Sequence, residues 1–226
     1  GSFEIPNTRL ASRMLAQFAG EDLSTKPEAQ LRKHMSRFMG LPMYFLKFHG
    51  STNPDTVIET MRHAVYAYDV KHIIIDNLQF MMSVHGHTKF SGDKYDLQDA
   101  AVASFRRFAT EQRVHITLVV HIRKEQSSSS LDLNSIFGSA KTTQEADNVL
   151  MLQKLSRSSS KRYLEVLKNR YDGTLGKIYL SYDKDSSSIK QIAEPPPRQR
   201  NVKLIRPATG LDELTQLRIS ESTELL

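Results

Sequence analysis

A run of three isoleucines, residues 73–75, ends at an acidic residue, Asp76, and constrains the fold more than any other pattern in the chain. Consecutive β-branched residues without polar alternation are typical of a strand buried on both faces, as in a parallel sheet flanked by helices. Open α/β sheets bind ligands at the carboxyl ends of such strands, where a carboxylate can hold the Mg²⁺ of a nucleotide. The alternative is that Asp76 only caps the segment that follows.

The composition narrows the class of protein. The 226 residues contain no cysteine, which excludes disulfides and thiolate metal sites and suits a reducing compartment such as the cytosol or an organelle matrix. The net charge of +6 favours a polyanionic partner. No apolar run approaches the roughly 20 residues that span a bilayer. No signal peptide is visible, and we expect the chain to begin inside a domain, at the end of a strand.

Strand and helix patterns alternate over the first part of the chain, and from residue 148 on only strand patterns follow. Capping residues and helical spacing predict helices that begin after Asn7 or Thr8, within residues 21–40, after Asn53, and over residues 93–111 with Leu97, Ala100, Ala101, Phe105 and Phe108 inside. Apolar runs predict a strand end at residues 3–5 and strands at 44–46, 73–76, 114–120, 148–152, 163–167 and 178–182. This order predicts an α/β sheet with a parallel centre and an antiparallel edge hairpin. The pattern fails after Ile192, so we expect a domain over residues 1–192 and a flexible tail over 193–226.

Polar residues at strand ends are the first candidates for chemistry. His121 follows the apolar strand 114–120, as Asp76 follows its own. A histidine there can donate to a phosphate oxygen, or it can be a surface residue beside Arg123 and Lys124. Glu4 ends the first strand, where a carboxylate can deprotonate a water that attacks a phosphate. The alternative is a carboxylate that the dipole of the next helix favours.

Two cations, Lys168 and Arg170, lie at the end of a predicted hairpin whose turn is Asp172-Gly173. Residues spaced by one position point the same way along a strand, so the hairpin can present both charges to a neighbouring subunit. The planar fork of arginine suits a phosphoryl transition state. The alternative is a solvated hairpin tip.

A loop of small residues, 137–141, ends in Lys141, and Arg123 and Lys124 lie at the other end of the same loop. Small residues allow a backbone to approach closely, and the three cations can meet phosphates. The loop is therefore a candidate for binding single-stranded nucleic acid through its backbone. The alternative is an ordinary flexible connection.

The order of these motifs closely resembles the mitochondrial replicative DNA helicases of the Twinkle family, and more distantly the phage primase-helicases and DnaB ring helicases. The resemblance covers residues 1 to about 192 and rests on five motifs in order. They are Ser-Phe-Glu-Ile (2–5), Ile-Ile-Ile-Asp-Asn-Leu-Gln-Phe-Met-Met (73–82), Leu-Val-Val-His-Ile-Arg-Lys (118–124), Ile-Phe-Gly-Ser-Ala-Lys (136–141) with Gln-Glu-Ala-Asp-Asn-Val-Leu (144–150), and Lys-Asn-Arg-Tyr-Asp-Gly (168–173).

The resemblance implies the C-terminal part of a RecA-like motor domain, with helices on both faces of its sheet, in a 5′→3′ helicase that uses ATP and Mg²⁺. It implies a role for each matching residue: Glu4 as catalytic glutamate, Asp76 as metal ligand, His121 as phosphate sensor, Lys168 and Arg170 as trans-acting cations, Gln79 and Tyr182 near the nucleotide, and Arg123, Lys124 and Lys141 on DNA. It also implies single-stranded and forked DNA as substrate and a hexameric or heptameric ring. The mitochondrial DNA polymerase and single-strand-binding protein are implied as partners, and the matrix nucleoid as location.

One departure from the family is plain. The phosphate-cradling pattern Gly-x-x-x-x-Gly-Lys-Ser/Thr occurs nowhere in these residues, whereas in the family it lies just upstream of the strand that ends at Glu4. We therefore expect a C-terminal fragment or a short isoform of a longer helicase, and poor ATP binding by these residues alone. The alternative function is a non-catalytic chain that binds DNA or joins the helicase ring as an assembly subunit.

Overall fold

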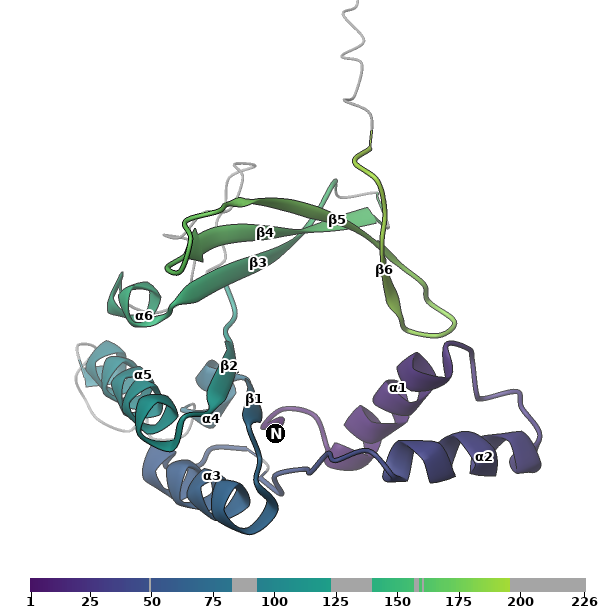
Figure 1. Cartoon of the computed structure of the whole chain (residues 1–226), viewed down its shortest axis with the longest axis horizontal. Helices are drawn as coiled ribbons and strands as arrows, with labels where there is room; N and C mark the ends of the chain where they lie inside the picture. Colours follow the sequence, from purple (N-terminus) through teal and green to yellow (C-terminus); the bar gives the residue numbers. More distant parts are fainter. Residues whose placement is uncertain (49, 83–92, 123–139, 157–158, 160, 196–226) are drawn as a thin grey trace, which may run out of the picture. The chain divides into compact units, whose positions relative to one another are not determined.

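The structure is a computed structural model that describes residues 1–48, 50–82, 93–122, 140–156, 159 and 161–195 (Figure 1). The chain divides into two units, Gly1–Glu194 and Pro195–Leu226, and all described elements lie in the first. In chain order they are α1 (Asn7–Ala19), α2 (Glu28–Met39), α3 (Pro54–Tyr68), β1 (His72–Asp76), α4 (Leu78–Met81), α5 (Asp93–Gln112), β2 (His115–Val119), α6 (Ala140–Glu145), β3 (Asn148–Lys154), β4 (Lys161–Asn169), β5 (Gly176–Tyr182) and β6 (Ile189–Gln191).

A parallel pair of strands, β1 and β2, forms the first sheet, in the register that pairs Asp76 with Val119. The first residues of the chain extend this pair, because Ser2 forms a parallel bridge with Asp76. The amide of Phe3 donates to the carbonyl of Asp76 at 2.7 Å. Residues 3–5, predicted as a strand end, form no strand in the structure; the bridge lies one residue earlier, at Ser2, and three chain segments run side by side at this edge.

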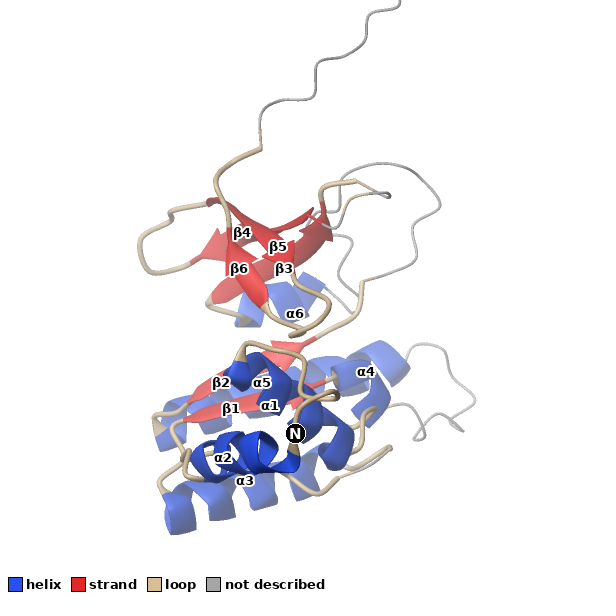
Figure 2. Ribbon diagram, turned by 90° about the vertical axis from the view of Figure 1, so that its right-hand side faces the viewer, coloured by secondary structure: helices blue, strands red, loops and turns tan. Residues whose placement is uncertain are grey.

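The main core lies on one side of the β1–β2 pair. Ile73 and Ile75 are buried there against residues of α3, α4 and α5, such as Met61 and Phe105. Figure 2 shows α3 and α5 beside the two strands. Ile74 points to the other face and is 50% exposed. The prediction that all three isoleucines are buried is therefore wrong, because the strand buries only alternate residues in the part of the chain that is described.

The antiparallel part of the fold is a four-stranded sheet in the order β3-β4-β5-β6. Among the described residues, no strand of this sheet pairs with β1 or β2. The two groups of strands are therefore separate sheets. The predicted strands at 148–152, 163–167 and 178–182 are each present and longer at their ends. The short strand β6 was not predicted, because its three residues alternate Ile-Lys-Gln without an apolar run.

Several helix boundaries differ from the prediction. The N-cap of α1 is Pro6, and the Asn7 side chain instead donates through Nδ2 to the carbonyl of Leu46 at 3.0 Å. The helix expected within 21–40 begins only at Glu28, after Pro27. By contrast, Asn53 caps α3 as predicted, with its side chain accepting from the amide of Asp55.

Two further expectations fail. Residues 44–46 form no strand among the described residues. On α5, Ala101, Phe105 and Phe108 are buried, whereas Leu97 is 43% exposed and Ala100 is also exposed. The predicted inner face of this helix is therefore correct only over its second half.

Candidate functional site

Asp76 and His121 lie at the same edge of the β1–β2 pair. Asp76 is the last residue of β1, and His121 follows β2 by two residues. The backbone on both sides of Asp76 is fixed, since its amide donates to the carbonyl of Gly1 at 2.9 Å and its carbonyl accepts from Phe3. The hydroxyl of Ser2 donates to the Asp76 carboxylate at 3.2 Å. The carboxylate is thus held at the carboxyl ends of parallel strands, where α/β sheets bind ligands.

Asn77 joins three of the elements at this edge. Its side chain is fully buried, and its Nδ2 amide donates to Glu4 Oε2 at 3.0 Å and lies 3.3 Å from His121 Nε2. Its Oδ1 accepts from the amide of Phe80 at 2.8 Å and so caps α4. The structure therefore brings Glu4 and His121, which are far apart in the chain, onto one amide group beside Asp76.

Asn77 was not assigned a role from the sequence. The available signal was local: asparagine is a favoured N-cap, and it precedes an apolar residue, Leu78, that begins a short helix. That signal predicts the cap but not the contacts with Glu4 and His121, which depend on residues 73 and 44 positions away.

Gln79 fixes the backbone of His121. Gln79 Oε1 accepts from the His121 amide at 3.0 Å, and Gln79 Nε2 lies 3.4 Å from the His121 carbonyl. An amide nitrogen can only donate, so the His121 Nε2 that faces Asn77 accepts a hydrogen bond when the ring is neutral. The His121 side chain is exposed and therefore accessible to a ligand at the strand ends.

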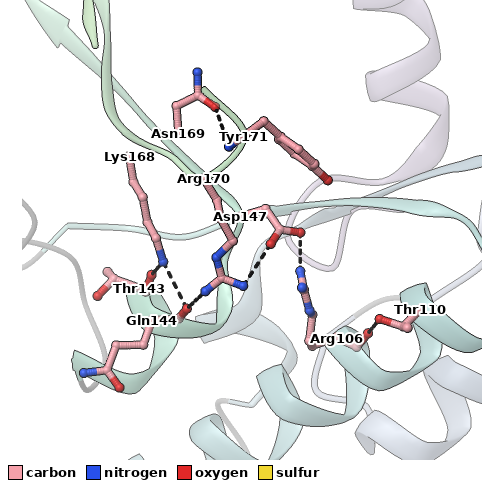
Figure 3. A network of polar contacts seen from close by, with 9 residues as sticks. All are labelled: Arg106, Thr110, Thr143, Gln144, Asp147, Lys168, Asn169, Arg170 and Tyr171. Atoms are coloured by element: carbon pink, nitrogen blue, oxygen red, sulfur yellow. Dashed lines mark hydrogen bonds and ion pairs between the residues drawn. The ribbon is translucent and has the colours of Figure 1, made fainter. Parts of the chain in front are cut away.

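Lys168 and Arg170 converge on the end of α6, as Figure 3 shows. Lys168 Nζ donates to the carbonyls of Thr143 and Gln144 at 2.8 and 3.0 Å. Arg170 donates to the Gln144 carbonyl through Nη2 at 2.9 Å and to Asp147 Oδ1 through Nη1 at 3.1 Å. The two cations thus lie together as their spacing predicts, and they donate to carbonyls in the last turn of α6.

The remaining predicted site residues lie elsewhere or outside the described part. Tyr182 is at the end of β5, and the Arg162 guanidinium lies over its ring, with Cζ 4.8 Å from the ring centroid. Arg123 and Lys124 lie outside the described residues, and Lys141 is described only as backbone within α6. We call Glu4, Asp76, Asn77 and His121 the strand-end group, and Lys168 and Arg170 the hairpin cations. No hydrogen bond or ion pair among the described residues joins the two.

The strand-end group fits a Mg²⁺–nucleotide. Asp76 is half-buried and keeps one carboxylate oxygen without a hydrogen bond from the described residues. Mg²⁺ usually takes one or two carboxylates and fills its shell with waters and phosphate oxygens. Accordingly, the described residues contain no group of three or more His, Asp or Glu side chains that could hold a metal alone. Asp76 is the residue that fits this cation.

Solved structures share this fold. The chain is similar to a DnaB-like replicative helicase, solved in a study of its interactions with primase, with a TM-score of 0.71 and 16% identity over 85% of this chain and 51% of that one. It is also similar to the ATPase domain of G40P, with a TM-score of 0.72 and 15% identity over 85% of this chain and 73% of that one. The chain thus spans about half the length of the DnaB-like helicase chain. These likenesses confirm the predicted RecA-like α/β fold class.

None of the helices in the described part of the chain is long and apolar enough to cross a membrane. The sequence pattern of the family described as AAA domain matches residues 1–127, which include α1 to α5, β1 and β2 and the whole strand-end group. With more than half of its residues in that match, the chain belongs to the AAA domain family.

Proposed function

We propose that this chain is the nucleotide-hydrolysing part of a ring-shaped, ATP-dependent 5′→3′ replicative DNA helicase of the mitochondrial Twinkle type. The observation that carries the proposal is the Glu4–Asn77–His121 contact beside Asp76. A general base, a phosphate contact and a metal ligand are the groups that phosphoryl transfer to water requires, and they converge at this edge of the sheet. The likeness to replicative helicase ATPase domains supports the same function.

Each side chain has a distinct task in this proposal. Glu4 is exposed, and its carboxylate accepts the proton of the attacking water while the Asn77 amide fixes its direction. His121 donates to a γ-phosphate oxygen from its exposed ring. Asp76 would hold Mg²⁺, which when bound neutralises charge on the β- and γ-phosphate oxygens.

The hairpin cations complete the site from a second subunit. Arg170 is half-exposed, and its planar guanidinium can bind phosphate oxygens bidentately. In this proposal Lys168 and Arg170 serve a nucleotide bound to a neighbouring copy in a hexameric or heptameric ring. The lack of a hydrogen bond or ion pair from them to the strand-end group, within the described part of one chain, supports this division.

The proposed setting is DNA replication in the mitochondrial matrix. Single-stranded and forked DNA are the substrates, with the cations Arg123, Lys124 and Lys141 on the phosphate backbone. The mitochondrial DNA polymerase and single-strand-binding protein are the expected partners. The net charge of +6 supports a polyanionic substrate.

Steady-state ATP hydrolysis by the full-length protein, with and without single-stranded DNA, tests the proposal. We expect Glu4→Gln and Asp76→Asn each to lower kcat by about 10² or more, since general bases contribute roughly 10²–10⁴. Asp69→Asn is the matched control, because Asp69 is an exposed carboxylate whose partner is Lys71. Wild-type turnover in both site variants would remove the proposed function.

A second candidate function is a non-catalytic short isoform or assembly subunit that binds DNA or the helicase ring. It is favoured by the absence of the pattern Gly-x-x-x-x-Gly-Lys-Ser/Thr from the 226 residues. Without that loop, we expect the purified 226-residue chain to release little phosphate from ATP. Phosphate release at the rate of the full-length protein would exclude this candidate, and DNA binding without any turnover in the full-length protein would favour it.

A further inference from the structure

Asp147 is the centre of a charged cluster outside the strand-end group. It lies between α6 and β3, and its carboxylate accepts from two arginines, Arg106 through Oδ2 and Arg170 through Oδ1 (Figure 3). Its backbone carbonyl also accepts from the Arg170 amide at 2.9 Å. One residue therefore holds both the main chain and the guanidinium of Arg170.

The Oδ2 atom of this carboxylate connects it, through Arg106, to a helix of the main core. Arg106 is on α5, between the buried Phe105 and the nearby Phe108, which are each 2% exposed. The hydrogen bond from Arg106, together with its charge, holds the pKa of Asp147 below its ordinary value, so the carboxylate is ionised at neutral pH. The same contact raises the pKa of Arg106. The hairpin end is thus anchored through one carboxylate to a helix with a fixed place in the core.

The cluster leaves Arg170 with donor capacity and a surplus of positive charge. Its guanidinium is engaged through Nη1 and Nη2, and its side chain is 50% exposed. Three cations act on the Asp147 carboxylate: Arg106, Lys168 and Arg170. A second carboxylate, Glu145, is close enough to act on Arg106 through its charge. An arginine held at two points, exposed and in a cationic surrounding is pre-organised for an incoming phosphate.

We propose that Asp147 is a positioning residue for phosphoryl transfer, which fixes the Arg170 guanidinium between α5 and the end of α6 so that it meets the phosphate of a nucleotide on the neighbouring subunit. The inference rests on the proposed function, since it needs Arg170 to act on a nucleotide. Asp147 does not touch the nucleotide; it acts through Arg170.

Asparagine at position 147 is the sharpest change. Asp147→Asn keeps the size of the side chain, but its amide presents a donor to one of two guanidinium groups that can only donate. Arg170 then loses a fixed direction without losing its charge. We expect kcat for ATP to fall roughly 10- to 100-fold, because a displacement of about 1 Å can cost 10² in rate. We expect KM to change by less than about threefold, since the interaction is stronger in the transition state.

The test is a double-mutant cycle in the full-length protein with single-stranded DNA present. Arg170→Ala, Asp147→Asn and the pair are compared with wild type, and Asp69→Asn is the matched carboxylate control. If Asp147 acts through Arg170, adding Asp147→Asn to Arg170→Ala lowers kcat no further. A full additional loss in that background means a separate structural role and overturns the inference. So does wild-type kcat in Asp147→Asn.

A second variant keeps the test decisive if Asp147→Asn does not fold. Arg106→Lys keeps the positive charge beside Asp147 but loses the rigid fork that directs the carboxylate. We expect a smaller fall in kcat, again absent in the Arg170→Ala background. Loss of activity in Arg170→Ala with no effect of either Asp147→Asn or Arg106→Lys refutes the inference alone, whereas full activity in Arg170→Ala, Glu4→Gln and Asp76→Asn refutes the proposed function as well.

Discussion

At the scale of single residues, one buried amide decides the geometry of the candidate site. Asn77 uses its oxygen to cap α4 and its nitrogen to contact Glu4 and His121. A buried side-chain amide with all of these contacts has little freedom to turn, because each alternative leaves a polar atom without a partner. The direction of the Glu4 carboxylate is therefore set by a residue that has no chemical role itself.

Asn77→Ala tests this double role against a matched cap. Asn53 also caps a helix, α3, with its side chain accepting from the Asp55 amide at 2.8 Å, and its cap contact does not involve Glu4 or His121. Losing an N-cap costs about 1 kcal/mol of stability, so both Asn77→Ala and Asn53→Ala should lower the free energy of unfolding in urea. Only Asn77→Ala should lower kcat for ATP, by about tenfold or more. Equal kcat values for the two variants would show that Asn77 is a cap alone.

The Asp147 carboxylate predicts a defined pH dependence. Arg106 holds its pKa below the ordinary value of 3.8, so the folded state gains stability from the ionised carboxylate above that pH and loses it as the pH falls through the lower, folded-state value. The difference in unfolding free energy between wild type and Asp147→Asn should then be constant from about pH 7 to 5 and shrink below about pH 4. Denaturant titrations at each pH measure it. A difference that changes mainly between pH 5 and 7 would contradict this assignment.

The sequence predicted single residues well where the cause is local. Asp76 and His121 each follow an apolar strand, so their shared edge could be predicted, and the structure places both there beside Glu4. Asn77 and Asp147 were missed as functional residues because their importance comes from distant partners. The contact of Asp147 with Arg106 spans 41 positions, and no local pattern marks it.

At the scale of elements, the turn between β4 and β5 determines where the cations lie. Asp172 Oδ1 accepts from the Thr174 amide at 2.8 Å and from Asn169 Nδ2 at 2.6 Å, and these bonds hold its pKa below the ordinary value. Gly173 has a φ of 73°, which other residues adopt only with strain. The turn is therefore closed by side-chain bonds and by one left-handed glycine, three residues after Arg170.

Gly173→Ala should consequently weaken the hairpin. Space is not the cause, since a Cβ at Gly173 meets nothing within 4 Å, and the cost comes from the left-handed backbone alone. That cost is about 1–2 kcal/mol. Gly176→Ala is the matched control, because Gly176 starts β5 with equally open space and an ordinary φ. Urea unfolding should show a loss only for Gly173→Ala. Similar free energies of unfolding for both variants would refute the strain argument.

The same distinction explains which elements could be predicted. Three strands of the antiparallel sheet, β3, β4 and β5, contain apolar runs between turn signals, and each of these was predicted within a few residues of its ends. Residues 44–46 have the same composition but form no strand, because nothing in a short apolar run specifies a pairing partner. The separation of the two sheets depends on tertiary pairing, which periodicity does not encode.

At the scale of the whole molecule, the groups that phosphoryl transfer needs are divided between two places. Glu4, Asp76 and His121 gather at the ends of the parallel strands, and Lys168 and Arg170 gather at the end of α6. Within the described part of the chain each group is held by its own contacts. In the proposed helicase, a division of this kind suits a nucleotide shared by two copies, with one group of residues contributed by each.

DNA binding is the property that tests the molecule as a whole. The cations Arg123, Lys124 and Lys141 bracket one serine-containing loop, and the tail contains the cations Arg198, Arg200 and Lys203. If the loop follows the phosphate backbone, the triple alanine variant at positions 123, 124 and 141 should bind all single-stranded sequences more weakly. Each lost contact reduces the salt slope by roughly 0.7, so the slope should fall by about 2 for three contacts.

The measurement is affinity for single-stranded DNA at several salt concentrations, made with the full-length protein. The matched control replaces Arg198, Arg200 and Lys203 with alanine, which removes the same charge from the tail and should leave the slope close to that of wild type. The loop variant should also lose DNA-stimulated ATP turnover more than basal turnover, because Arg123, Lys124 and Lys141 are separate in the chain from Glu4 and Asp76. A slope that is unchanged in the loop variant and reduced in the tail variant would assign the DNA contacts to the tail, since the counterions released on binding must be those that the contacting cations replace.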